Sequence, residues 1–564
     1  MPGARFSEFA KTLEKVRLTT KKNEKVAILS AYLAKLDLNE VGYAARFATG
    51  RATLKGSADE TQVGSSTLTG VLFELTGVTQ AELGRSYLKH GDLSESFAEF
   101  MGRKREAALF AEEGLTIAEV ASTFERITEA KGKGSASLKG ELVKSLLLRS
   151  ESPLEAKYIV KVLSKEMRIG LVDGLVEEAI AAAFPRAGSR EEVKEAHLLV
   201  GDVGLLARAA KEGDLGRVRI EPMRPTNFML AEPMATPREI ADYFEGKELY
   251  AEYKYDGVRA QAHKVGGEVK VFSRRLEEIT ASFPEVVDAV RRVPHDLILD
   301  GEIVAFDEKK GPLSFQLLQR RLRRADVEES KRIAPVAYFC FDVLYLDGKA
   351  LYEQPFSVRR ETLWRALAGS PIRRADTAAV RTAEEIEAFF RKSRSLGYEG
   401  LVLKEAQSPY TPGRRGRFWA KLKEELDTLD VVIVAAEFGH GKRAGKISDY
   451  TFAVRDGEGL KVIGKAYSGL TDKEIDEMGE RIRKISSGRG YRMEVKPEIV
   501  IEVAFDSIQR SDRHDSGYAL RFPRIKRVRY DKSPSAIDTL GRVKKVYEAQ
   551  KVRAPAQDED AGRE

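Results

Sequence analysis

The chain has 564 residues, of which 42% are hydrophobic and 32% are charged, and its formal net charge is +7. This length favours three or four domains with buried cores. No stretch approaches the roughly 20 apolar residues of a membrane span, and the N-terminus lacks the apolar segment of a secretory signal. The single cysteine, Cys340, excludes an internal disulfide and a multi-cysteine zinc site. We therefore expect an intracellular protein (cytoplasmic in a prokaryote) without a membrane segment, and the positive charge weakly indicates a polyanionic partner.

Residues 1–220 are expected to form an all-α domain. The segment Ser152-Pro-Leu-Glu155 is typical of a helix start, with a serine N-cap, a proline in the first turn and a glutamate that reaches back in a capping box. Apolar residues continue at helical spacing as far as Val162 and predict one buried face. A second apolar helix is predicted over residues 173–184.

A connector with four prolines between residues 222 and 237 marks the next predicted boundary. We expect residues 221–425 to form an α+β domain, because apolar and polar residues now alternate. Gly266-Gly267 indicates a hairpin turn. Strands are predicted over residues 249–255, 268–272, 297–306 and 336–346, and helices over residues 284–293 and 378–393.

Residues 426–550 alternate short strands with one helix, a pattern that fits a five-stranded OB-fold β-barrel. The helix is expected to start at Thr471, with Glu474 completing a capping box. The polar residues 551–564 are expected to be a disordered tail. The strands of this domain are predicted over residues 431–435, 450–454, 460–466, 493–495 and 499–505.

The segment Glu252-Tyr-Lys254-Tyr-Asp256-Gly-Val-Arg259 carries the clearest chemical signal. A strand leads Lys254 into a tight Asp-Gly turn, with Glu252 on the same face of the strand. A lysine amine is a nucleophile only when it is deprotonated, and a neighbouring cation such as Arg259 favours that form. Taken alone, so short a motif is more often a surface strand with a Lys–Glu pair that ends in a hairpin turn, so the other segments have to decide.

Six further segments that carry charged or aromatic residues follow the motif in order along the chain. Their order and spacing resemble the nucleotidyltransferase superfamily of DNA ligases, RNA ligases and messenger-RNA capping enzymes. In detail they resemble ATP-dependent DNA ligases of the long form found in archaea and in eukaryotic replication, to about residue 550. The segments are Ser273-Arg274-Arg275, Leu299-Asp-Gly-Glu302, Phe341-Asp-Val-Leu, Glu399-Gly-Leu-Val-Leu-Lys404, Trp419-Ala-Lys421-Leu-Lys423 and Arg521-Phe-Pro-Arg524.

This resemblance implies that Lys254 attacks the α-phosphorus of ATP and holds AMP as a phosphoramidate. The AMP then passes to the 5′-phosphate at a nick, and the 3′-hydroxyl displaces it. The resemblance also implies Mg²⁺ or Mn²⁺ as cofactor, with Glu302 and Glu399 as the metal carboxylates. The implied nucleotide contacts are Glu252 and Phe341 to the base, Arg259, Arg274 and Glu302 to the ribose and phosphate, Arg415, Lys421 and Lys423 to the α-phosphate, and Arg521 and Arg524 to the pyrophosphate.

The implied partner is nicked double-stranded DNA, which the helical domain would grip mainly through phosphates. ATP is favoured over NAD, because NAD-dependent ligases carry a four-cysteine zinc element and this chain has one cysteine. The resemblance further implies a monomer whose barrel domain swings between steps about a hinge near residues 424–430. No segment identifies a sliding-clamp contact or decides between replication, repair and recombination.

Other interpretations remain open. An RNA ligase or a capping guanylyltransferase would share most of these segments, and a non-catalytic nucleic-acid-binding protein could combine helical and OB modules. The helical domain could dock a protein partner rather than DNA. Which of Arg414, Arg415 and Arg417 meets the nucleotide is also open. The basic stretch from Arg320 to Arg324 carries no assigned role.

Overall fold

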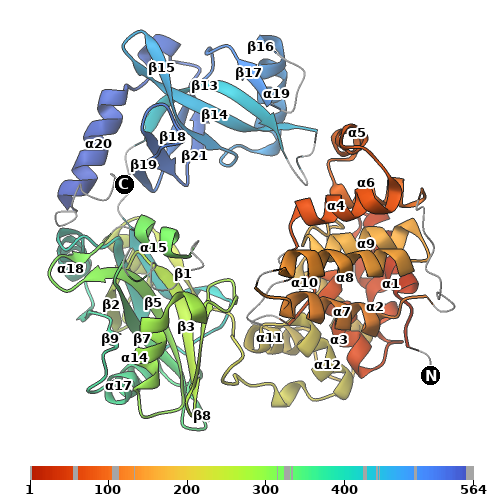
Figure 1. Ribbon diagram of the computed structural model, residues 1–564. Coiled ribbons are helices and arrows are strands. Elements are labelled where there is room, and N and C mark those ends of the chain that lie inside the picture. Colours follow the sequence, from red (N-terminus) through yellow and green to blue (C-terminus); the bar gives the residue numbers. More distant parts are fainter. Residues whose placement is uncertain are drawn as a thin grey trace.

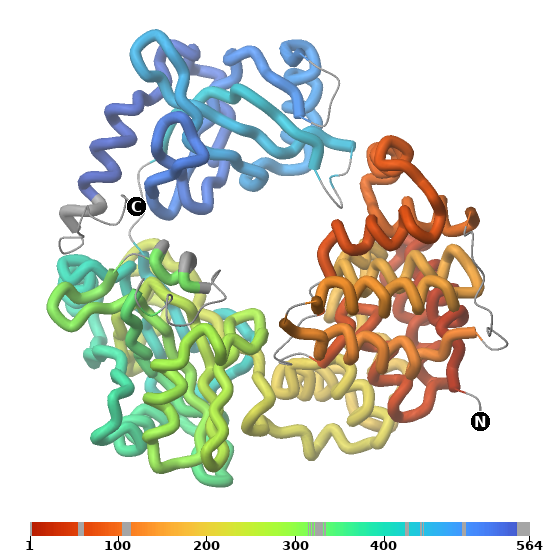
Figure 2. The backbone as a smooth tube through the Cα atoms, in the orientation of Figure 1, coloured from red at the N-terminus to blue at the C-terminus, as the bar shows by residue number. Residues whose placement is uncertain are grey.

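The computed structural model describes residues 3–54, 61, 63–103, 114–132, 134–313, 315–322, 331, 334–423, 428–439, 443, 445–487 and 492–553. Three regions follow one another along the chain (Figure 1). The backbone tube in Figure 2 runs from the helical region, through the middle region, to the C-terminal region, which returns towards the helical one. No helix in the described part of the chain is both long enough and apolar enough to cross a membrane.

The first region is all-α, as predicted. Its helices are α1 (Phe6–Leu18), α2 (Lys22–Leu33), α3 (Leu38–Ala48), α4 (Ser65–Thr76), α5 (Gln80–His90), α6 (Leu93–Met101), α7 (Ile117–Glu129), α8 (Ser135–Arg149), α9 (Pro153–Leu163), α10 (Asp173–Ala183), α11 (Arg190–Val200) and α12 (Val203–Glu212).

Local sequence signals set several of these helix starts. Complete capping boxes open α3, α5, α7 and α11, which satisfies backbone donors that a helix start leaves free. The predicted N-cap Ser152 accepts from the backbone N of Glu155 at 3.3 Å. The predicted reciprocal bond is wrong, because the Glu155 carboxylate accepts from the backbone N of Glu151 instead, at 3.2 Å.

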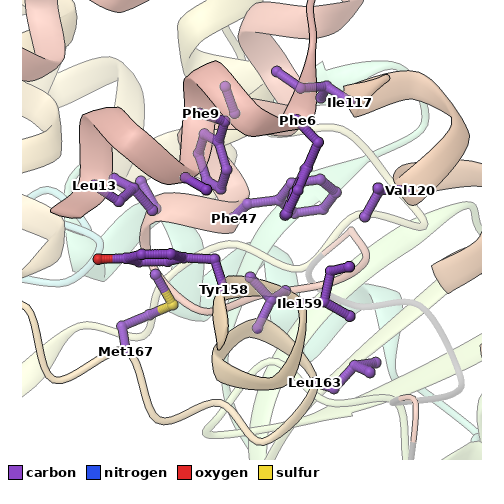
Figure 3. Packing of buried hydrophobic residues seen from close by; sticks show 14 of the residues in the cluster. Phe6, Phe9, Leu13, Phe47, Ile117, Val120, Tyr158, Ile159, Leu163 and Met167 are labelled. Atoms are coloured by element: carbon purple, nitrogen blue, oxygen red, sulfur yellow. The ribbon is translucent and has the colours of Figure 1, made fainter. Parts of the chain in front are cut away.

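One apolar core joins the helices of this region (Figure 3). Phe47 lies at its centre, with ring centroids 6.1 Å from Phe9 and 5.3 Å from Phe124 in edge-to-face geometry. Such pairs add about 0.5–1.5 kcal/mol each beyond the area they bury. Tyr158, predicted to lie on the buried face of its helix, is fully buried.

The middle region is α+β, as predicted, and holds two sheets. The smaller has the strand order β1-β12-β11-β2-β10, and the larger runs β4-β3-β5-β7-β8, with β6 and β9 at its side. The bounds are β1 (Leu230–Met234), β2 (Leu249–Lys254), β3 (Val258–Val265), β4 (Glu268–Ser273), β5 (Leu297–Asp307), β6 (Gly311–Pro312), β7 (Val336–Leu346), β8 (Lys349–Ala350), β9 (Arg373–Arg374), β10 (Thr377–Val380), β11 (Gly400–Glu405), β12 (Arg415–Lys423), α13 (Pro237–Tyr243), α14 (Pro284–Arg291), α15 (Phe315–Leu322), α17 (Phe356–Ala366) and α18 (Ala383–Ser395).

The helix predicted over residues 378–393 begins later than expected. Thr377–Val380 is strand β10, which pairs antiparallel with β2. The helix, α18, starts at Ala383 because Thr382 and Glu385 form a capping box there. Four residues of strand thus complete the sheet that carries Lys254, ahead of the helix.

The C-terminal region is β-rich, as predicted, and Thr471 and Glu474 form the predicted capping box of α19. Its ladder runs from β15 through β14 and β13 to β18 and β21. Its elements are β13 (Leu429–Phe438), β14 (Ile447–Asp456), β15 (Gly459–Ala466), α19 (Asp472–Ile485), β16 (Ser486–Ser487), β17 (Arg492–Val495), β18 (Val500–Ala504), β19 (Ser507–Arg510), β20 (Tyr518–Arg521), β21 (Arg524–Val528) and α20 (Leu540–Arg553).

Barrel closure in this region stays a prediction. Among the described strands no ladder joins β15 to β21, although the backbone N of Ile525 donates to the carbonyl of Ser468 at 2.9 Å, just beyond the end of β15. The disordered tail was expected from residue 551, yet α20 continues to Arg553. Residues 554–564 lie outside the described part of the chain.

Candidate active site

A cavity of about 810 Å³ lies between the two sheets of the middle region. The chain crosses from one sheet to the other at Lys254, the last residue of β2, through the Tyr255-Asp-Gly257 turn into β3. Of the predicted site residues, nine line this cavity: Glu252, Lys254, Arg259, Arg274, Glu302, Phe341, Arg415, Lys421 and Lys423.

Strand register brings the charged groups around Lys254 together. Lys254 pairs with Gly400 of β11, and Gly400 pairs with Lys423 of β12. A Cβ at Gly400 would collide with the carbonyl oxygen of Leu422, so this close approach requires glycine. The neighbouring Glu399 therefore lies beside both lysines, and its carboxylate forms ion pairs with Lys254 and Lys423.

The end of the cavity near Lys254 carries a cluster of positive charges, two of which form ion pairs with the Glu399 carboxylate. Burial lowers the pKa of Lys421, and the nearby charges of Lys423, Lys254 and Arg415 lower it further. For Glu399, burial would raise the pKa of the carboxyl, but the two lysines outweigh burial and hold it below its usual value. An anion with several phosphates would find here the cations that neutralise it.

The opposite end is buried and aromatic. The Glu252 carboxylate and the Lys404 ammonium form an ion pair at 2.6 Å, and both side chains are almost fully buried. The Lys404 Nζ lies over the rings of Phe341 at 4.3 Å, Trp419 at 4.5 Å and Phe356 at 4.6 Å. Burial raises the pKa of Glu252 and lowers the pKa of Lys404, and the charge of each partner opposes that shift.

Arg259 and Glu302 face each other across the antiparallel β3–β5 ladder. Burial raises the pKa of Glu302 to about 8, against the opposing charges of Lys254 and Arg259. The Arg259 guanidinium forks onto the buried Asp300, at 2.8 and 3.1 Å. Arg274, at the end of β4, has its pKa lowered by burial and by Arg259.

The C-terminal region reaches the mouth of the cavity through the predicted Arg521. Its Nη1 lies 3.1 Å from the Asp256 carboxylate, and its guanidinium carbon lies 4.4 Å from the ring centre of Phe315, which lines the cavity. Arg524, also predicted, lies 3.9 Å from Asp506. Asp506 lies the same distance from Lys423, so a second link of charges spans the two regions.

The three candidate arginines, Arg414 just before β12 and Arg415 and Arg417 inside it, have different contacts. Arg415 lines the cavity. Arg414 forms an ion pair with Glu195 of α11, at 3.1 Å, and so joins the middle region to the helical region. Arg417 has a positive φ of 68°, and its backbone N donates to the hydroxyl of Tyr243. Arg415 is therefore the arginine placed to meet a ligand in the cavity.

Lys404, Asp300 and Trp419 lie inside the sequence motifs, but no role in the site was predicted for them. The structure places Lys404 and Trp419 in the cavity wall, and Asp300 directly behind Arg259. Lys404 pairs with Glu252 and Asp300 pairs with Arg259, both far away in the sequence, so the motif alone could not identify the partner. Their position beside predicted site residues was the available signal.

Comparison with known proteins covers all three regions. The chain matches the family models DNA ligase N terminus over residues 5–181, ATP dependent DNA ligase domain over residues 228–423, and ATP dependent DNA ligase C terminal region over residues 443–532. A solved structure described as Pmar-Lig_PreS3 has a TM-score of 0.58 at 15% identity, covering 92% of this chain and 99% of its own, and so shares the fold.

Two curated relatives match over almost their whole length. A probable DNA ligase of Koribacter versatilis is 42% identical over 96% of both chains. A DNA ligase of Methanocella arvoryzae is 37% identical over 97% of this chain and 98% of its own. With this identity and coverage, and with three successive family models, the chain belongs to the ATP-dependent DNA ligases.

Proposed function

We propose that this ligase seals nicks in duplex DNA through an AMP adduct on Lys254. The observation that carries the proposal is the placement of Lys254 at the junction of the two sheets, where it faces the cavity among the cations Arg415, Lys421 and Lys423. A nucleophilic amine, a phosphate-neutralising cluster and a buried aromatic end thus share one cavity.

In the first step the Nζ of Lys254 forms a bond to the α-phosphorus of ATP, and the bond from that phosphorus to the bridging oxygen breaks. Phosphoryl transfer requires mainly alignment and charge neutralisation, which Arg415, Lys421 and Lys423 supply beside the reacting phosphorus. The leaving pyrophosphate would depart towards Arg521 at the mouth of the cavity, where the contact with Asp256 already holds this arginine.

The buried end suits a planar base. Phe341 offers a ring for stacking, and Glu252 offers a carboxylate that accepts from an exocyclic amino group such as that of adenine. Arg259 and Arg274 line the same cavity and would contact the ribose and its phosphate.

Two further transfers complete the proposed cycle. An oxygen of the 5′-phosphate at the nick attacks the phosphorus of the lysyl adduct, and the N–P bond breaks. The 3′-hydroxyl then attacks the 5′-phosphorus, the new phosphodiester forms, and AMP leaves. One chain carries every residue invoked, so the proposal requires only a monomer.

Mg²⁺ or Mn²⁺ fits the donor set of this cavity. Hard cations prefer carboxylate and phosphate oxygens; Glu399 forms an ion pair with Lys254, and Glu302 lines the same cavity. Among the described residues no three acidic, histidine or cysteine side chains gather into a metal site, which fits a cation that arrives with the nucleotide phosphates. When bound, the cation would neutralise phosphate charge. Glu302 would hold the cation through its ionised carboxylate.

DNA binding would use the helical region as the second side of a clamp, mainly through phosphates. The C-terminal region would have to leave the cavity mouth before the nick enters, because Arg521 occupies it in this structure. Part of the predicted hinge near residues 424–430 lies outside the described residues, since the description resumes at residue 428.

Labelled nucleotides separate this proposal from its rivals. The protein is incubated with labelled ATP or labelled GTP and then given nicked DNA or RNA ending in a 5′-diphosphate. We expect labelling by ATP and sealing of the nicked DNA. Labelling by GTP with transfer to the RNA would favour a capping enzyme, and the absence of labelling would favour a non-catalytic binding protein.

A further inference from the structure

Arg259 is held from behind by a closed ring of hydrogen bonds. Its Nη2 and Nε donate to the Asp300 carboxylate, and its Nη1 donates to the carbonyl of Met229 at 2.7 Å. The Tyr410 hydroxyl donates at 2.7 Å to Asp300 Oδ2, the oxygen that also accepts from Arg259 Nη2, and it accepts from the backbone N of Met229 at 3.0 Å. The ring therefore passes through both backbone groups of one residue and returns to Arg259.

This ring joins three walls of the cavity. Met229 directly precedes Leu230 and Ala231, which line the cavity. Tyr410 lies in the connection between β11 and β12, five residues before Arg415, and its ring packs edge-to-face on Trp419 at 5.8 Å. A shift of any one wall would consequently move the Arg259 guanidinium.

Two features allow the ring to fix the orientation of the Arg259 guanidinium. Asp300 and Tyr410 are almost fully buried, so water cannot replace a lost partner without rearrangement. Three of the five N–H donors of Arg259 point backwards into the ring, and the remaining two are available to a ligand. The guanidinium carbon also lies 5.0 Å from the ring centre of Phe228, 5.4 Å from that of Phe341 and 5.7 Å from that of Trp419.

We propose that Tyr410 is a positioning residue for adenylation, which acts through Asp300 to aim the two free donors of Arg259 at the nucleotide. It makes no contact with the ligand itself. Removing its hydroxyl would leave a buried carboxylate oxygen and a buried backbone N–H each short of one partner, and Arg259 would lose its fixed direction. The inference rests on the proposed lysyl-AMP chemistry.

The test compares Tyr410→Phe with Tyr338→Phe as the matched control. Tyr338 also buries a bonded hydroxyl in the middle region, which donates to the carbonyl of Ala260 at 2.8 Å, but it is not part of the ring. The rate of lysyl-AMP formation is measured over a range of ATP concentrations. We expect Tyr410→Phe to raise the KM for ATP about tenfold with a smaller loss in kcat, and Tyr338→Phe to leave both near the wild-type values.

A second measurement distinguishes positioning from a merely structural role. In an Arg259→Ala background, Tyr410→Phe should have no further effect on KM, because the group through which it acts is gone. Full additivity of the two changes, or an equal rise in KM for Tyr338→Phe, would overturn the inference. Either result leaves the proposed function intact as long as wild-type protein is labelled and Lys254→Ala is not.

Discussion

Two buried lysine–carboxylate pairs of almost equal geometry lie in different regions of this ligase. In the helical region, Lys161 of α9 meets Asp92, the N-cap of α6, at 2.7 Å. In the middle region, Lys404 meets Glu252 at 2.6 Å. Burial lowers the pKa of both lysines, and in each case the carboxylate opposes the shift.

The surroundings of the two pairs differ. Asp92 also accepts from the backbone N and the hydroxyl of Ser94, so that pair closes a joint between two helices. Glu252 and Lys404 line the cavity, with aromatic rings on one side and space for a ligand on the other. A buried ion pair alone therefore does not indicate function. The Glu252–Lys404 pair is identified as part of the site because it lines a cavity.

Breaking each pair in turn gives the largest effects and tests the comparison most severely. We expect Lys161→Met and Lys404→Met each to lower the free energy of unfolding by about 3–5 kcal/mol, because each leaves a carboxylate buried without its partner. Denaturant unfolding measures both losses. Lysyl-AMP formation per folded molecule should fall only for Lys404→Met. Equal losses of labelling in the two variants would show that the pairs do not differ in function.

A smaller effect is expected at the mouth of the cavity. Arg521→Ala removes the cation proposed to meet the leaving pyrophosphate, so lysyl-AMP formation should slow roughly 100-fold. Sealing of a nick that already carries AMP should stay close to the wild-type rate, since no pyrophosphate leaves in that step. The control is Arg527→Ala, whose ion pair with Glu502 lies within the C-terminal region. Equal slowing of both reactions would remove the proposed role of Arg521.

His263 extends the comparison to a buried group whose partners are not charged. Its Nδ1 accepts from the backbone N of Met223, its Nε2 lies 3.3 Å from the Gln261 amide oxygen, and burial lowers its pKa to about 3. A lowered pKa favours the neutral imidazole in the fold, so this stability is present above the unfolded pKa of 6.5 and is lost as the pH falls towards 3.

Between pH 7 and pH 5 the loss should amount to about 2 kcal/mol. A His263→Gln variant should therefore show a flatter dependence of unfolding free energy on pH across this range. The measurement is denaturant unfolding at several pH values. Parallel curves for the variant and the wild type would contradict the assignment.

Local signals in the sequence predicted most elements. Thr471 with Glu474 identified α19, and alternation identified β5 and β7, because caps and periodicity act over a few residues. The predicted helix over residues 378–393 wrongly included residues 378–380, which form a strand only because they pair with β2. OB closure and the domain boundaries stay predictions.

The residues of the site also divide into those that the sequence predicted and those that it did not. The motif residues Lys254, Glu302 and Lys421 were named from the sequence and meet in one cavity. The partners behind them were not predicted, because Tyr410 follows Asp300 by 110 positions and lies in the connection between β11 and β12, so only the tertiary fold brings the two together. No local pattern marks a tyrosine hydroxyl that is buried against a carboxylate so far away in the chain.

Intact-mass measurement after incubation with ATP and Mg²⁺ tests the central claim most directly. The account predicts that wild-type protein gains the mass of one AMP, that peptide mapping locates the adduct on Lys254, and that Lys254→Ala gains nothing. An adduct on another residue, or an equal gain in Lys254→Ala, would contradict the assignment of the nucleophile and every step built on it.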